Sequence, residues 1–198
     1  IKQQLEAQID KSKQILDQKY QAAIDTIRMQ GIELDRRLIE LNALVGKYSH
    51  CTNVNEAQKV ITELEQSLDR VNDFKHDTEC FLETARKMEM TDFDYSKIDD
   101  TKASLEKIHA QWSEYLAFMD ELNGLFDQSL IDVDLRKLII FLNKHNEREL
   151  RAMNHPLFDS MATHLAELQQ YQPLFNILSR IPLDEPKWKD ILKILSET

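Results

Sequence analysis

Residues 20–48 read YQAAIDTIRMQGIELDRRLIELNALVGKY, and this stretch decides the fold. Its apolar positions step by four and three residues, which is the heptad spacing that turns one face of a helix towards a neighbouring helix. Residues 1–48 are therefore predicted to form one long helix. Its seam comprises Tyr20, Ile24, Ile27, Gly31, Leu34, Leu38, Leu41, Val45 and Tyr48.

Gly31 interrupts the apolar side chains of this seam. A glycine there has two interpretations: it admits a close neighbour, or it only weakens the helix, by about 1 kcal/mol. We favour the second interpretation.

Two further helices are predicted over 55–88 and 96–126, separated by a loop over 89–95. In the second helix the apolar spacing weakens around Lys75, so looser pairing is expected there. The second seam comprises Ala57, Ile61, Leu64, Leu68, Val71, Thr78, Leu82 and Ala85. The third comprises Ile98, Thr101, Leu105, Ile108, Trp112, Tyr115, Met119, Leu122 and Phe126.

The remainder of the chain predicts three more helices. Residues 133–153 are expected as one helix, and its run 138–142 is apolar all round, which predicts burial on several sides. Pro156 suits the first turn of a fifth helix, and Pro173 is predicted to kink that helix because proline lacks an amide hydrogen. A last helix is expected over 185–195.

These elements predict an all-α fold, because 3 Gly and 4 Pro in 198 residues provide few turns for a β fold. The predicted architecture is an elongated antiparallel helical bundle. A long coiled-coil-like αα-hairpin over residues 1–90 is followed by a shorter helical bundle over residues 91–198.

The net charge of −10 argues against nucleic acid and an anionic membrane surface as partners, since both select basic proteins. No apolar run is long enough for a transmembrane helix, and residues 1–14 do not resemble a signal peptide. Cys51 and Cys80 are interpreted as reduced thiols, which indicates the cytoplasm.

No catalytic, cofactor-binding or metal-ligating set is predicted. Gly46-Lys47 is followed by Tyr48 and lacks the first glycine of a phosphate loop, and the chain contains no Gly-x-Gly. His50 and Cys51 are adjacent, but no second ligand pair follows at zinc spacing. Trp112 and Tyr115 share one helical face, where core packing is a better interpretation than a binding site.

The stretch 165–195 reads LAELQQYQPLFNILSRIPLDEPKWKDILKIL. Its Pro-Leu helix, short break and Trp-bearing last helix resemble the region of a dynein heavy chain where the N-terminal tail becomes the linker. The resemblance covers residues 81–195 and includes Trp112 in a Trp-x-x-Tyr-Leu setting. The family's Arg-His-Trp stands here as Pro186-Lys187-Trp188, so the contacts of that basic pair do not carry over.

The resemblance implies a non-enzymatic, force-transmitting segment of a microtubule motor, without a cofactor of its own, in the cytoplasm or cytoskeleton. Its partners would be the rest of the heavy chain and, through the tail, intermediate chains, light chains or other heavy chains. We favour the axonemal class, and hence the cilium, over the cytoplasmic class because axonemal paralogues are more numerous. The structural seam would comprise Trp112, Tyr115, Leu168, Tyr171 and Trp188. The hinges would be Pro173, Ile181, Pro182 and the loop 89–95.

A second interpretation belongs to a different class of protein. The heptad helices fit a spectrin-like or coiled-coil adaptor that tethers two protein partners without motor activity equally well. The residues around Trp188 favour dynein over the adaptor.

Overall fold

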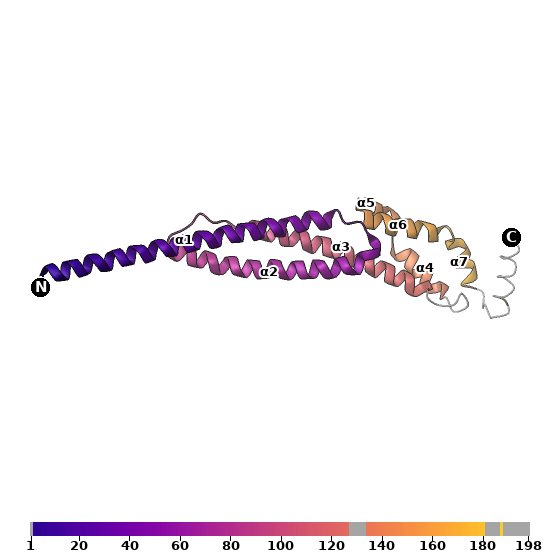
Figure 1. The fold of residues 1–198 in the computed structure, drawn as a ribbon. Helices are drawn as coiled ribbons and strands as arrows, with labels where there is room; N and C mark the ends of the chain where they lie inside the picture. The colour runs from indigo at the N-terminus through magenta and orange to yellow at the C-terminus, as the bar shows by residue number, and fades with distance from the viewer. Residues whose placement is uncertain (1, 127–133, 181–186, 188–198) are drawn as a thin grey trace. The chain divides into compact units, whose positions relative to one another are not determined.

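The computed structural model describes residues 2–126, 134–180 and 187, and within them every regular element is helical. This confirms the predicted all-α helical bundle. The elements are α1 Lys2–Ser49, a 3-10 turn η1 Val54–Glu56, α2 Ala57–Lys87, α3 Lys97–Phe126, α4 Leu135–Lys144, α5 Glu147–Ala152, α6 Pro156–Gln169 and α7 Gln172–Leu178 (Figure 1).

Contacts divide the chain into two compact units. The first holds residues 1–51 and 62–109, and therefore α1, most of α2 and the first part of α3. The second holds residues 52–61 and 110–198, and therefore η1, the start of α2, the end of α3 and α4 to α7. The boundary predicted between residues 90 and 91 falls inside the first unit, because the loop after α2 packs back onto α1.

In the first unit α1 and α2 run antiparallel, as the predicted hairpin requires. Lys47, late in α1, pairs with Glu63 early in α2 over 2.8 Å, and Arg37 pairs with Asp77 further along α2 over 2.8 Å. The predicted α1 seam is confirmed at five positions that are fully buried: Ile27, Gly31, Leu34, Leu41 and Tyr48.

Ser67 and Phe81 take the buried positions of α2 that were predicted for Leu68 and Leu82, and the seam also differs at the level where it was expected to weaken. Phe74 and not Lys75 fills this level, and its side chain is fully buried. The buried positions keep the three-four spacing without a break. Two of them are polar, Ser67 and Thr78, and their hydroxyls donate to backbone carbonyls of α2, which allows both side chains to be buried. They are Leu64, Ser67, Val71, Phe74, Thr78, Phe81 and Ala85.

In the second unit α4 and α5 replace the single helix predicted over 133–153. The chain is extended at His145 and Asn146, and the Asn146 side chain accepts a hydrogen bond from the Arg148 amide, which caps α5. Burial of the apolar run is also one-sided and not all round: Phe141 is buried, whereas Ile140 is 65% exposed.

Pro173 ends the predicted fifth helix instead of kinking it. α6 stops at Gln169, and α7 begins at Gln172 with Pro173 in its first turn, where no amide hydrogen is needed. Tyr171 lies in the break and is 57% exposed, so its assignment to the buried seam is wrong. The predicted hinges Ile181 and Pro182 and the seam residue Trp188 lie outside the described residues.

Candidate functional site

The loop that connects α2 to α3 starts from a strained helix end. Glu89 adopts a left-handed conformation with φ 59°, and the amides of Glu89 and Met90 donate to the carbonyls of Arg86 and Ala85. This is the Schellman arrangement, in which glycine usually occupies the left-handed position. The tight reversal directs the next residues of the chain back along α1.

Phe93 of this loop lies against the backbone of α1 at Gly31. A β-carbon placed on Gly31 would overlap the Phe93 ring, with two further ring atoms at 3.1 Å. The Phe93 ring also meets Phe81 of α2 edge-on, with centroids 4.8 Å apart. Gly31 therefore admits a close neighbour, so the interpretation we favoured from the sequence is wrong.

Tyr95 completes the same site from the loop just before α3. Its hydroxyl donates to the carbonyl oxygen of Gly31 over 3.2 Å, and its ring meets Phe74 and Phe81 edge-on at centroid distances of 6.0 and 6.2 Å. Burial and the nearby Asp35 carboxylate raise the pKa of Tyr95 to about 12, because both disfavour a phenolate. We call Gly31, Phe74, Phe81, Phe93 and Tyr95 the aromatic clamp.

Polar contacts surround the aromatic clamp on its solvent side. Arg37 pairs with Asp77, and its guanidinium lies 5.3 Å from the Phe74 ring centre, so the cation covers the edge of the aromatic cluster. Lys75 pairs with Asp99 over 2.7 Å, which ties α2 to the first turn of α3.

A polar contact also links α3 to α1 within the first unit. The hydroxyl of Thr101, which is buried, lies in hydrogen-bond contact with the side-chain oxygen of Asn42. All three helices of the unit are thus joined around the loop.

The aromatic clamp packs the predicted hinge loop 89–95 against α1 and α2. From the sequence, residues 89–95 are predicted only as a loop and a hinge, with no role for their aromatic residues. Two signals in the sequence indicate the clamp. One is an unbroken three-four spacing through Phe74 and Phe81 once Ser67 and Thr78 are admitted, and the other is a pair of aromatic residues at the end of a short polar loop.

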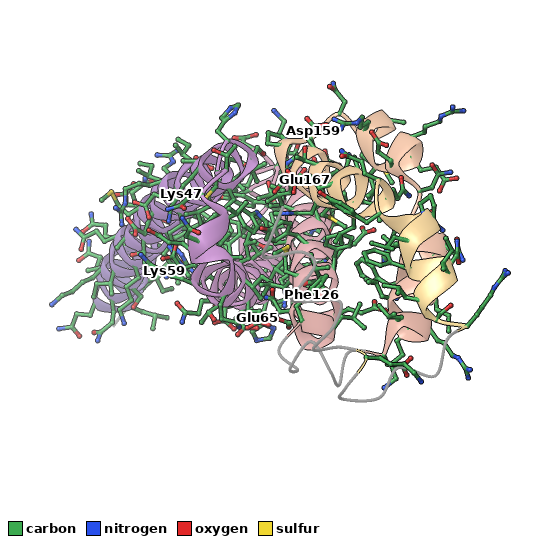
Figure 2. All side chains as sticks on the ribbon, turned by 90° about the vertical axis from the view of Figure 1, so that its right-hand side faces the viewer. Lys47, Lys59, Glu65, Phe126, Asp159 and Glu167 are labelled. Atoms are coloured by element: carbon green, nitrogen blue, oxygen red, sulfur yellow. The ribbon has the colours of Figure 1, made fainter. Side chains whose placement is uncertain are left out.

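The second unit contains the other predicted seam residues. Trp112 and Tyr115 are buried and meet edge-on, with ring centroids 6.3 Å apart. Leu168 is half-buried and, with the exposed Tyr171, lines an open groove of about 530 Å³. Phe126 and Glu167 (labelled in Figure 2) border the same groove from α3 and α6.

His145 forms a second cluster in this unit, at the C-terminal end of α4. Its ring lies 5.0 Å from the Phe118 ring and 4.8 Å from the Phe141 ring, and Nε2 is 3.9 Å from the Glu121 carboxylate. Burial, with a smaller contribution from neighbouring Lys144, holds the pKa of His145 below its usual value.

Ligand chemistry is sparse in the part of the chain that the structure describes. There, no three His, Cys, Asp or Glu side chains gather in a way that could hold a metal ion. Among the described helices, none has the length and apolar character needed to cross a membrane.

The aromatic clamp and the His145 cluster are therefore packing sites, made of rings, backbone and paired charges. A comparison of the chain with protein-family models, curated proteins and solved structures found no match.

Proposed function

We propose that this chain is a load-bearing helical segment without catalysis of its own, and that it joins the tail of a dynein heavy chain to the linker of the motor. The observation that carries the proposal is the aromatic clamp. A segment that transmits force needs few free joints, and Phe93 and Tyr95 fasten the longest described loop to α1. The resemblance of residues 81–195 supports the identity of the parent chain.

In this proposal bending is confined to the places where a helix is interrupted without a clamp. One such place is the break at Gln170 and Tyr171, before Pro173. A hydrogen bond from the side-chain amide of Gln172 to that of Asn143, at 3.1 Å, joins α7 to α4 across this break. It is exposed to solvent, so it yields more easily than the buried rings of the aromatic clamp.

A gliding assay on the parent motor tests force transmission. A Gly-Ser stretch inserted at Ile181 is expected to slow or stop microtubule gliding while ATP turnover continues, because a flexible linker does not carry a directed force. The same stretch inserted at Thr52, in the turn between α1 and η1, is the matched control and should leave gliding unchanged, because the aromatic clamp still joins α1 to α2 and to the loop before α3. Unchanged gliding with the Ile181 insertion would favour a passive tether.

The second candidate function is a spectrin-like adaptor that tethers two protein partners. The observation that favours it is the first part of α1, which is helical, wholly exposed over residues 2–22 and yet carries several large apolar side chains. The parent sequence separates the two candidates. Several hundred further residues followed by Walker A loops identify a motor, and their absence leaves the adaptor.

A further inference from the structure

The first turns of α1 carry an apolar row that nothing in the described chain covers. Figure 1 shows these turns extending beyond the end of α2. Every residue from 2 to 22 is exposed. Four of their large apolar side chains lie on one face of the helix: Leu5, Ile9, Leu16 and Tyr20, which are 62%, 47%, 67% and 49% exposed. We call these four side chains the arm row.

The arm row continues the packed face of the same helix. Leu5, Leu16 and Ile27 are spaced by eleven residues, as are Ile9, Tyr20 and Gly31. Eleven residues make three turns of about 3.67 residues each, so such positions follow an almost straight line along a helix. Ile27 and Gly31 are buried in the first unit. The face that packs inside the unit therefore runs on, uncovered, for five more turns of α1.

Charge indicates what covers the arm row. Residues 1–25 contain four lysines and four acidic residues, so the net charge of −10 is carried by residues 26–198. An anionic membrane selects amphipathic helices with a basic polar face, which this stretch lacks. Another copy of the same neutral stretch can approach it without net repulsion.

We propose that the arm row is a self-association surface, on which the α1 arms of two copies of this chain pair antiparallel. The repulsion between two bodies of net charge −10 favours this direction, because antiparallel arms hold the bodies at opposite ends. A twofold axis between Ser12 and Lys13 sets residue n of one arm opposite residue 25 − n of the other. Leu5 then faces Tyr20 and Ile9 faces Leu16, so each member of the row meets another member.

Sedimentation equilibrium of the chain tests the association. The wild-type chain is expected to be a concentration-dependent dimer in the micromolar range. A variant with Leu5→Gln, Ile9→Gln, Leu16→Gln and Tyr20→Gln is expected to raise the dimer Kd by more than about a hundredfold, since it removes the apolar contacts of both arms. Ile15→Gln is the matched control: Ile15 is 46% exposed on the same arm but lies off the row, so the dimer should persist.

Disulfide formation tests the direction of pairing. In a background with Cys51→Ser and Cys80→Ser, Leu5→Cys alone should give no covalent dimer, whereas Leu5→Cys together with Tyr20→Cys should link readily. A parallel dimer would instead link through Leu5→Cys alone, which would overturn the antiparallel register. A wild-type chain that stays monomeric, or a dimer that the four glutamines leave intact, would overturn the self-association itself.

Discussion

The hydroxyl of Tyr95 donates a hydrogen bond to the backbone carbonyl of Gly31, 64 residues earlier in the chain, and the Phe93 ring occupies the space where a side chain at position 31 would lie. Gly31 thus has two roles on a long helix: it presents its carbonyl to a buried phenol and leaves room for an aromatic ring. The conformational cost of a glycine within α1 is offset by both contacts.

Replacement of Gly31 by Ala is therefore expected to destabilise the chain. The overlap with Phe93 destabilises the fold by about 1–3 kcal/mol, whereas the higher helix propensity of alanine stabilises it by only about 1 kcal/mol. Urea unfolding followed by far-UV circular dichroism measures the change. Gly46→Ala in the same helix is the matched control. A β-carbon on Gly46 meets nothing within 4 Å, so this substitution should stabilise α1 by about 1 kcal/mol.

A double substitution separates the overlap from other effects of alanine at position 31. In a chain that already carries Phe93→Ala the ring is gone, so Gly31→Ala should change from destabilising to stabilising. A Gly31→Ala effect of equal size with and without the Phe93 ring would show that the two residues do not interact.

Tyr95 makes the first unit sensitive to alkaline pH. Its folded-state pKa, raised to about 12, lies above the ordinary tyrosine value of about 10. The unfolded chain therefore loses the phenol proton first, and the stabilisation by neutral Tyr95 is present below pH 10 and is lost as pH rises towards 12. Tyr95→Phe should cost about 0.5–1.5 kcal/mol at neutral pH, for one lost hydrogen bond.

Urea unfolding measured from pH 9 to pH 12 tests this dependence. The wild-type chain should lose stability more steeply than Tyr95→Phe, because the variant has no phenol at this site. Parallel pH profiles of the two proteins would show that Tyr95 has the same pKa in the folded and the unfolded chain, which would contradict the prediction.

Trp112 is expected to be the costliest side chain to remove from the second unit. It is fully buried, so Trp112→Ala should destabilise by about 3–5 kcal/mol through lost burial and the cavity that remains. Its indole nitrogen has no hydrogen-bond partner among the described residues. Trp112→Phe should cost much less, because it removes this unpaired donor and keeps most of the apolar ring. Chemical unfolding of both variants measures the difference.

The sequence determined most of the fold through its spacing of apolar residues. In α3, three-four spacing located Ile98, Leu105 and Trp112 on the buried face, and all three are buried. Periodicity assigns residues to a face of their own helix, but in α2 it chose Leu68 and Leu82, whereas their neighbours Ser67 and Phe81 are buried. At Tyr171 the assignment is wrong because the helix ends before it.

The aromatic clamp was missed for a different physical reason. Heptad spacing describes how one helix packs against another, whereas Phe93 and Tyr95 reach α1 from the loop between α2 and α3. Contacts of that kind depend on how the chain leaves Glu89, in a left-handed conformation that glycine ordinarily marks in a sequence. The break between α4 and α5 at His145 was not predicted for a similar reason, because no proline or glycine stands beside the capping residue Asn146.

His145 is expected to make the second unit sensitive to mild acid. Its folded-state pKa lies below the ordinary histidine value of about 6.5, so the unfolded chain takes up the proton first. Stability associated with neutral His145 is thus present above pH 6.5 and is lost as pH falls through the folded-state pKa. An NMR titration of the His145 ring should give a midpoint below 6.5. Lys144→Gln should raise this midpoint, because it removes a nearby cation and leaves Glu121 free to face the ring. Glu121→Gln should lower it, and a midpoint unmoved by both substitutions would contradict this electrostatic account of the cluster.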